Sequence, residues 1–471
     1  MSLTALAWIA VYVGLAVLTF VRPAYGVGLY LLTFFASPAF WWWGSPIADI
    51  LGSRINLFTA ILFAAAVLMH SAQAAPALTR EQRLIIALLV VYALNATVIH
   101  FVNAANPPRS FNGMTMIWKQ VGLLLLLMLS IRNRSDFNIF LGAILLGAFY
   151  LEFEVIVNDR GRFSAGRLEG IGAPGVGDAN YLSGLMLLVP PLAAYWLFFG
   201  SRVQKVFAAV CQVFSLEVIL RCNSRGAFLA MAVAGVWLLL AARGKARQYA
   251  FAGLCLGGLA ALLMINDEHI IERFSSTFAG LEERDASAQG RLDYWRCAVS
   301  MISDHPIGSG AEAAFKSKRG ANYIIHFVDT RKHPDGFRAV HNGYLDIAAS
   351  WGVQGFAMYA AAIFVCWRSI RRVTQSARGT TDYKAAFLGA CLQSALVGQL
   401  VVALFLSSFD GEWFFWCFAL ASAFSQHFTA DSVVVSGRLP AQTLPMRPPA
   451  MAYRPSDPEA GRRDAISGPT L

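Results

Sequence analysis

Residues 226–242 read "GAFLAMAVAGVWLLLAA", an apolar run without a charged side chain. At ~1.5 Å per residue, such a run forms a helix that covers most of the ~30 Å of hydrocarbon in a bilayer. The runs "GLLLLLMLSI" at 122–131 and "AFAGLCLGGLAALLMI" at 250–265 have the same character. Of the 471 residues, 57% are hydrophobic and only 14% are charged. With a mean hydropathy of +0.53, the sequence predicts an all-α polytopic membrane protein.

Apolar segments of this kind recur along the chain and predict about 12–13 transmembrane helices. We place them at residues 3–20, 25–40, 57–75, 84–100, 116–131, 138–157, 181–199, 206–221, 225–241, 249–265, 342–367, 384–407 and 413–428. The first segment has no basic residue before it and no small-residue cleavage site after it. We therefore expect a retained helix and not a cleaved signal peptide.

Five short loops between these segments are basic, namely 79–83, 132–134, 201–205, 243–247 and 368–379. Two predicted helices separate each loop from the next, so all five should lie on one side of the membrane. An excess of Lys and Arg marks the cytoplasmic side. The same alternation places residues 101–115, 158–180, 221–225, 266–340 and 408–412 on the opposite, external face.

This topology divides the chain into four parts. Transmembrane helices 1–10 occupy residues 1–265, a mixed-charge soluble insert follows at 266–340, and helices 11–13 occupy 341–429. The proline-rich tail 430–471 should be disordered and cytoplasmic. Within the insert, Leu292, Trp295, Ala298 and Met301 recur at helical spacing, which predicts an amphipathic helix able to lie at the membrane interface.

Composition also bears on the function classes. The formal charge of +10 does not indicate nucleic-acid binding, because membrane proteins gather Lys and Arg on their cytoplasmic face. The seven cysteines form no C-x-x-C pair, so we expect small core residues and neither a disulfide framework nor a zinc site. The sequence contains no P-loop, no Rossmann fingerprint and no G-x-S-x-G motif.

Polar residues that are unusual beside apolar helices gather on the external face. They are Arg160, Arg162, Arg167, Arg225, Arg291, Arg338, His341 and Asp410. Ionisable groups near membrane depth usually face a cavity or a partner, and the planar donor fork of arginine suits phosphate oxygens. Such a set would suit a lipid-linked diphosphate. For Arg160 and Arg162, pairing with a nearby acid explains the residue equally well.

His341 opens the segment "HNGYLDIAASWGVQG", in which Asn342 and Asp346 follow it. Its imidazole titrates near neutrality and can take a proton from a sugar hydroxyl, although a helix cap or interface residue is the plainer reading of one histidine. Asp410 could orient the imidazole or pair with an arginine. No tight carboxylate triplet occurs, so we expect arginines to neutralise the diphosphate without a metal or any other cofactor.

In their order and spacing, "GRLEG…GDANYLSG", "NSRGAFLA", "GRLDYWRCAVSMISDHPIGSG" and "HNGYLDIAASWGVQG" resemble the bacterial O-antigen ligase and polymerase family. Its members are polytopic glycosyltransferases of the type C class. The resemblance spans about residues 160–420. One position departs from the family pattern, since Ala179 stands where a proline usually separates the acid from the asparagine.

The resemblance implies inverting transfer of a glycan from undecaprenyl diphosphate, on the periplasmic side of the inner membrane, to lipid A-core. Carried over by motif, His341 would be the catalytic base, Arg225 and Arg291 would bind the diphosphate, and Asp410 would be a supporting acid. Arg167 and Asn180 would shape the donor site. We expect Arg160, Arg338 and Asn342 to contact substrate at its rim.

Other functions stay open on the sequence alone. The same donor would serve an O-antigen polymerase or a protein O-oligosaccharyltransferase, because acceptor recognition lies in loops without a portable code. A transporter for a lipid-linked glycan would also line its path with arginines. A transporter should show repeat symmetry and helices interrupted at the midplane, whereas the polar residues here gather at one face. Sugar specificity and oligomeric state are not encoded in these patterns.

Overall fold

The computed structural model describes residues 2–71, 77–164, 166–264, 286–312, 316–328, 339–378, 382–409 and 411–428. Helices dominate these ranges, and the predicted all-α polytopic fold is confirmed. Eight of the described helices are long and apolar enough to cross a membrane, and shorter apolar helices accompany them.

Each of the predicted transmembrane segments contains a helix in its described part, and residues 181–199 are divided in two where Pro190 and Pro191 open a new helix. The helix predicted at 384–407 ends at Val402, and the one predicted at 342–367 continues to Arg378. In chain order the described elements are α1 (Leu3–Val21), α2 (Ala24–Phe35), η1 (Pro38–Phe40), α3 (Ser45–Leu51), η2 (Gly52–Arg54), α4 (Ile55–Met69), α5 (Arg80–Asn103), α6 (Pro107–Ser130), α7 (Arg134–Ile156), β1 (Arg162–Ser164), β2 (Arg167–Glu169), α8 (Ala179–Met186), α9 (Val189–Phe199), α10 (Arg202–Cys222), α11 (Arg225–Ala241), α12 (Lys245–Met264), α14 (Ala286–Asp304), α15 (Lys318–Phe327), α16 (Gly343–Arg378), α17 (Tyr383–Val402) and α18 (Glu412–His427).

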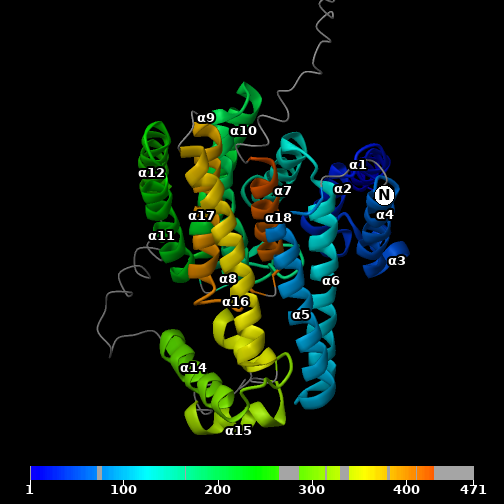
Figure 1. Ribbon diagram of the computed structural model, residues 1–471, viewed down its shortest axis with the longest axis vertical. Coiled ribbons are helices and arrows are strands. Elements are labelled where there is room, and N and C mark those ends of the chain that lie inside the picture. Colours follow the sequence, from blue (N-terminus) through cyan, green and yellow to red (C-terminus); the bar gives the residue numbers. More distant parts are fainter. Residues whose placement is uncertain are drawn as a thin grey trace, which may run out of the picture.

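Most of these helices run side by side along the long axis of the molecule, with α14 and α15 below them (Figure 1). The five basic loops meet at the upper end, which we call the basic end. There Arg134 approaches the Asp382 carboxylate to 3.8 Å, and Arg372 pairs with Glu81. We call the lower end, next to α14 and α15, the distal end.

The direction of α1 follows from contacts at its two ends. Arg22, just after α1, donates to the Asp136 carboxylate at 2.5 Å, at the basic end of α7. Trp8 packs against Trp43, whose indole nitrogen donates to the Tyr150 hydroxyl at 3.0 Å in the distal half of α7. The N-terminus therefore lies at the distal end, as an odd number of helices ending at the basic end requires.

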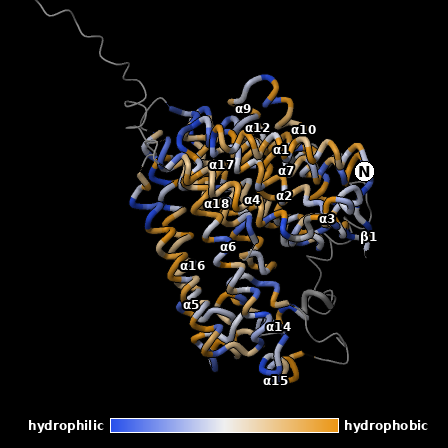
Figure 2. The backbone as a smooth tube through the Cα atoms, turned by 90° about the vertical axis from the view of Figure 1, so that its right-hand side faces the viewer, coloured by the Kyte–Doolittle hydropathy of each residue, from blue (hydrophilic) through white to orange (hydrophobic). Residues whose placement is uncertain are grey.

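The core of the bundle surrounds α17. Of the most apolar 18 residues of this helix 83% are buried, compared with 17% in the peripheral α1. Polar side chains of α17 donate to backbone carbonyls of its neighbours: Ser394 to Ala234 of α11 at 2.7 Å, and Gln399 to Gly184 of α8 at 2.8 Å. Such bonds hold helices together where lipid offers no partner. Figure 2 shows the predominantly hydrophobic bundle with hydrophilic stretches toward its ends. Six of the seven cysteines are buried, whereas Cys255 is exposed.

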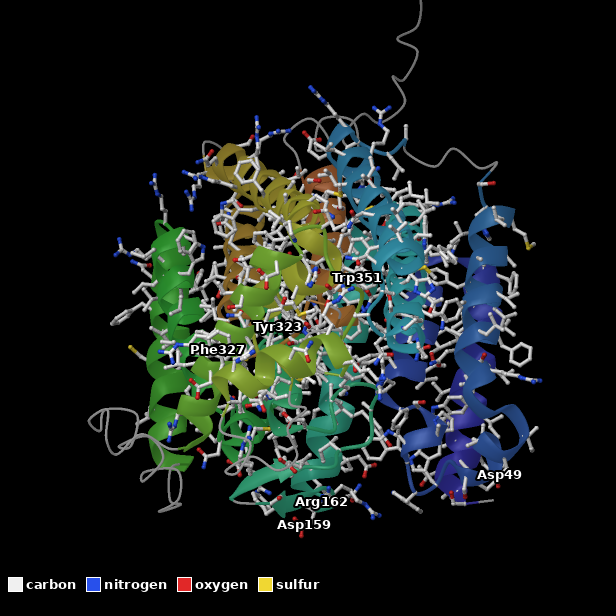
Figure 3. All side chains as sticks on the ribbon, turned by 90° about the horizontal axis from the view of Figure 1, so that it is seen from below. Asp49, Asp159, Arg162, Tyr323, Phe327 and Trp351 are labelled. Atoms are coloured by element: carbon white, nitrogen blue, oxygen red, sulfur yellow. The ribbon has the colours of Figure 1, made fainter. Side chains whose placement is uncertain are left out.

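The external segment 158–180 contains a short element that the sequence patterns did not predict, the antiparallel hairpin β1–β2, in which Phe163 faces Leu168 across the pair. The hairpin lies at the rim of the distal end, where Figure 3 labels Asp159 and Arg162. Hydropathy did not predict the two strands because each has only three residues, too few to show an alternating pattern.

The amphipathic helix predicted in the insert forms α14, but its apolar face meets protein. Tyr294, Cys297, Ala298 and Met301 are buried against α15 and α16, whereas Leu292 is exposed. Burial raises the pKa of the Cys297 thiol to about 11, as expected for a neutral core residue. Figure 3 shows α15, with Tyr323 and Phe327, crossing beneath the bundle.

The long helix α16 is broken at Gly352, which has φ 79° and ψ 169°. The break leaves the carbonyls before it without helical partners, and the motif "HPIGSG" at 305–310 supplies the donors. Ser309 N–H donates to Ala349 at 3.0 Å and Gly310 N–H to Ser350 at 2.9 Å. The Asn95 amide of α5 donates to the Trp351 carbonyl at 2.8 Å. This interruption, which the sequence patterns did not predict, fastens the insert to the bundle.

Replacing Gly352 should destabilise the protein. In Gly352→Ala, the new Cβ would require a left-handed backbone that L side chains rarely adopt, and it would collide with the Ile307 carbonyl and the Gln354 amide. We expect a loss of about 1–3 kcal/mol in the free energy of unfolding, seen as a lower melting temperature in detergent.

Gly122→Ala is the matched control, because Gly122 lies within α6 and a Cβ there meets nothing within 4 Å. Its melting temperature should be unchanged or slightly higher. Equal melting temperatures for the two variants would contradict the proposed importance of the break.

Candidate active site

At the distal end, three helices converge on the segment that follows α17. This segment, Ala403–Phe409, is called the 403–409 segment below. Its Ala403 carbonyl accepts from Gly343 N–H of α16 at 2.8 Å. The Tyr181 hydroxyl of α8 donates to the Ser407 carbonyl at 3.2 Å, and the Tyr359 hydroxyl of α16 donates to Phe409 at 2.9 Å. The chain thereby brings the starts of α8 and α16 to one place.

Glycines allow this close approach. A Cβ at Gly226 of α11 would lie 2.9 Å from the Phe405 side chain, and one at Gly343 of α16 would lie 2.8 Å from Phe409. Both glycines belong to the motifs "SRGAF" and "HNGY". The residue that precedes Gly226 is Arg225, and His341 lies two residues before Gly343. Close packing at the two glycines therefore fixes the positions of Arg225 and His341 at the starts of α11 and α16.

A hydrogen-bonded cluster joins the hairpin, α8 and α11. The Asn180 side-chain oxygen accepts from the Arg167 guanidinium at 2.6 Å and from the Ser224 hydroxyl at 3.0 Å. Arg167 also donates to the Cys222 carbonyl at 3.3 Å. Asn180 and Ser224 are both buried. The structure thus brings together Arg167, Asn180 and the start of the helix that carries Arg225.

The turn before α8 explains the alanine that departs from the family pattern. Asp178 caps α8 by accepting from Asn180 N–H at 2.7 Å, so Ala179 is the first helical residue. Proline is common at that position because its missing N–H has no helical partner there and its φ already suits the helix. Alanine adopts the same backbone freely, and Asn180 keeps its place.

Arg225 is the first residue of α11 and follows a tight turn. Asn223 ends α10 in the left-handed conformation, with φ 47°. Ser224 is the N-cap of α11, yet its side chain makes no cap bond because the hydroxyl donates to Asn180 instead. The Arg225 side chain is half-buried. A turn held by side chains from α8 and β2 therefore sets the direction of Arg225.

His341 has the same kind of backbone. Its φ is 51°, in the left-handed region that β-carbon-bearing residues seldom adopt. Asn342 follows as the N-cap of α16, and its side-chain oxygen accepts from Tyr344 and Leu345 N–H at 3.1 and 3.2 Å. Asn342 therefore caps α16 through its side-chain oxygen, and its predicted contact with substrate stays a prediction. Backbone strain of this kind concentrates at functional sites.

Arg291 reaches the same region from α14. One helical turn after it, the Trp295 indole donates to the Val340 carbonyl at 3.2 Å. Val340 directly precedes His341, and residues four apart lie on one face of a helix. The face of α14 that carries Arg291 is therefore anchored beside the residue that precedes His341. Sequence periodicity showed the apolar role of Trp295 but not this bond.

Three predicted residues remain, namely Arg160, Arg338 and Asp410. Arg160 lies 3.9 Å from the Glu154 carboxylate and 5.1 Å from the centre of the Trp42 ring. Both contacts fit the pairing alternative, and a substrate contact for Arg160 stays a prediction. Arg338 and Asp410 lie outside the described residues. Near Asp410 in sequence, the half-buried Glu412 accepts a hydrogen bond from Tyr30 of α2, and the sequence patterns did not single out this acid.

Within the described ranges, His, Cys, Asp and Glu side chains form no group of three able to hold a metal ion. The acidic stretch 267–285 lies outside those ranges, so metal independence stays a prediction. The polar groups that the structure does bring together at the distal end are arginines, an asparagine and a histidine. They can hold an anion and exchange a proton.

The Arg167–Asn180 bond can be tested by a double-mutant cycle. Arg167→Ala and Asn180→Ala should each lower the free energy of unfolding, because each removes the 2.6 Å bond between the half-buried guanidinium and the buried amide oxygen. The double variant should lose less than the sum, with a coupling of about 1 kcal/mol or more, measured by denaturant titration in micelles.

Arg162→Ala is the control for this cycle, because Arg162 is an exposed residue of the same hairpin. It should leave the free energy of unfolding unchanged. Strict additivity between Arg167→Ala and Asn180→Ala would show that the 2.6 Å contact does not hold the site together.

Residues 210–360 match the family model described as O-antigen ligase. No match is found among curated proteins. The matched range includes Arg225, Arg291, Arg338, His341 and Asn342, whereas Arg160, Arg167, Asn180 and Asp410 lie outside it. The match supports the resemblance read from the motifs: residues 210–360 are similar to the O-antigen ligase family.

Proposed function

We propose that the protein is an O-antigen ligase, an inverting glycosyltransferase that moves a glycan from undecaprenyl diphosphate to lipid A-core in lipopolysaccharide biosynthesis. The observation that carries the proposal is the convergence on the 403–409 segment. Gly343 and Tyr181 bond to it directly, and the Arg167–Asn180–Ser224 cluster places Arg225 beside it. The active site would then lie at the distal end.

The positive-inside rule gives the orientation of this site. The basic loops gather at the other end of the bundle, which the rule assigns to the cytoplasm. The distal end would face the periplasm from the inner membrane, with the lipid carrier between the helices. A lipid-held diphosphate and a water-borne acceptor can meet at that depth.

Arginines would stabilise the leaving group. Negative charge develops on the diphosphate as its bond to the sugar breaks, and preorganised cationic donors lower that barrier. Arg225 and Arg291 have the planar forks for this role. Arg167 is held by Asn180, so it would shape the donor site from the side. Arg338 and Asp410 would assist as a rim ligand and a supporting acid.

His341 would act on the acceptor. Its imidazole takes the proton from the acceptor hydroxyl as that oxygen bonds to the anomeric carbon. On the opposite face, the bond from the anomeric carbon to the diphosphate oxygen breaks, and undecaprenyl diphosphate departs with the electron pair. The configuration inverts in this single displacement. No nucleotide, metal or other cofactor is required, because the donor is already activated.

An O-antigen polymerase or a protein O-oligosaccharyltransferase would use the same donor chemistry and remains the alternative within the family. The break in α16 does not favour a transporter. Interrupted helices of transporters expose unwound carbonyls to their cargo. Here Ala349, Ser350 and Trp351 carbonyls already accept hydrogen bonds from residues 309–310 and Asn95.

His341→Ala should abolish transfer while donor binding persists. Loss of a general base lowers the rate about 10²–10⁴-fold, whereas the arginines that hold the diphosphate are untouched. The measurements are glycan transfer and retention of the lipid-linked donor by purified protein. Arg291→Ala should differ by weakening donor binding as well as transfer, because its guanidinium would hold the diphosphate in both the bound donor and the transition state.

His326→Ala is the matched control, since His326 is an exposed histidine of α15. It should transfer glycan at the wild-type rate. Full activity of His341→Ala would refute the assignment of the base.

One reconstitution experiment tests which acceptor the protein uses and whether transfer requires a metal ion. Purified protein receives undecaprenyl-diphosphate-linked glycan with either lipid A-core or a second lipid-linked unit, with and without chelator. We expect product on lipid A-core, formed equally well in chelator because arginines neutralise the diphosphate. Longer glycan on the carrier would instead identify a polymerase, and loss of product in chelator would refute metal independence.

A further inference from the structure

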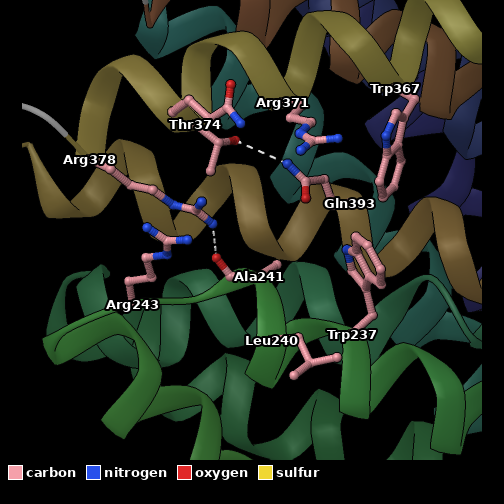
Figure 4. Close-up of a pocket in the computed structure, with 10 residues that line it drawn as sticks. Trp237, Leu240, Ala241, Arg243, Trp367, Arg371, Thr374, Arg378 and Gln393 are labelled. Carbon is pink, nitrogen blue, oxygen red and sulfur yellow. Dashed lines mark hydrogen bonds between the residues drawn. The ribbon is translucent and has the colours of Figure 1, made fainter.

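A cavity of about 200 Å³ lies at the basic end, where α11, α16 and α17 meet. It is far from the candidate active site, which lies at the distal end of the same helices. Arg243, Arg371 and Arg378 line it, together with Trp237, Trp367 and Gln393 (Figure 4). Its volume greatly exceeds the space that a single water requires.

The charge of this cavity is one-sided. Its ten lining residues include three arginines and no carboxylate. Arg378 donates to the Ala241 carbonyl, which bridges α16 and α11. The side chains of Arg243 and Arg371 are exposed, and no described carboxylate forms an ion pair with either. By contrast, Arg372 next in sequence pairs with Glu81. The cavity therefore presents positive charge that the described chain does not neutralise.

A buried donor faces the same cavity. The indole nitrogen of Trp237 is buried and finds no hydrogen-bond acceptor among the described residues. Trp237 packs against Trp367 with ring centres 5.1 Å apart. A buried N–H without an acceptor is costly, so an acceptor from outside the chain would satisfy it. At the floor, the Gln393 amide donates to Thr374 at 3.3 Å, which adds polar character.

The opposite wall of the cavity is apolar and exposed. Leu240 lines the cavity and is 62% exposed, and Val236 and Phe364, on the same two helices, are also exposed. In a membrane protein such side chains face lipid tails, and tryptophans favour the headgroup level. The arginines stand nearest the basic end of α11 and α16, and the tryptophans lie one to two turns further into the bundle with exposed Val236 and Phe364 beside them, an order that matches the headgroup, interface and acyl chains of a phospholipid.

We propose that this cavity binds the phosphate headgroup of an anionic phospholipid. Arg243 and Arg371 hold the phosphate oxygens, and the Trp237 N–H donates to one of them. The acyl chains run along Val236, Leu240 and Phe364 on the outer faces of α11 and α16. Basic pockets between transmembrane helices are suited to such headgroups. The site does not depend on the proposed transferase function.

The test is native mass spectrometry of the full chain in detergent, titrated with phosphatidylglycerol or phosphatidylcholine. Wild-type protein should retain phosphatidylglycerol preferentially. Arg243→Ala/Arg371→Ala should weaken this binding roughly 25-fold, since each arginine near a lipid headgroup contributes about fivefold. Arg243→Lys/Arg371→Lys should keep most of it. The control Arg202→Ala/Lys205→Ala removes two exposed charges from the same end and should bind as wild type does.

The indole donor has its own comparison. Trp237→Phe keeps the ring but removes the N–H, and it should weaken phosphatidylglycerol binding severalfold. Trp118→Phe should not, because that indole donates to Thr97 on α5 at 3.0 Å. Equal binding by the two alanine doubles, or equal retention of both lipids, would overturn the proposal. Displacement of the lipid by millimolar inorganic phosphate would overturn it in favour of a free-anion site.

Discussion

The break at Gly352 is the constraint on which the distal end depends. A helix interrupted beside apolar surroundings must give its freed carbonyls new donors, because lipid supplies none. Ser309 and Gly310 provide them, so residues 305–310 can occupy only one place. The helix α14 ends just before this loop, and its Trp295 in turn holds the Val340 carbonyl. The need to give hydrogen-bond donors to the carbonyls at this break thus helps to position both α14, which carries Arg291, and the backbone that leads to His341.

The starts of α11 and α16, where Arg225 and His341 stand, have a second feature in common. Asn223 and His341 both have left-handed backbones, and each stands two residues before a helix, α11 or α16, that packs against the 403–409 segment through a glycine. Left-handed residues turn the chain sharply, so a polar side chain can stand at the mouth of an apolar helix without entering the hydrocarbon. The energetic cost of these turns is offset by the hydrogen bonds of Asn180, Ser224 and Asn342 around them.

Hydropathy and charge were sufficient to predict the helices and their shared basic end, because both depend on the local sequence alone. Contacts between distant residues were not predictable in this way. Arg160 and Arg167 lie seven residues apart in one glycine-rich stretch, yet one contacts Glu154 and the other Asn180. In the sequence, Gly352 looks like an ordinary glycine in an apolar run. The break depends on hydrogen bonds from residues 309–310, which are distant in sequence. The apolar face of α14 was found, but not that protein, rather than lipid, covers it.

The same limit applies to the arginines of the basic end. The positive-inside rule explains why they are numerous, but it treats them as equivalent. The structure separates them by their neighbours: Arg22 has Asp136 and Arg372 has Glu81, whereas Arg243 and Arg371 share a cavity without a carboxylate. A charge that is already paired only marks a side of the membrane. A pair of charges beside a buried N–H and a lipid-facing wall has the chemistry of a binding site, and this difference arises only when α11 and α16 are packed together.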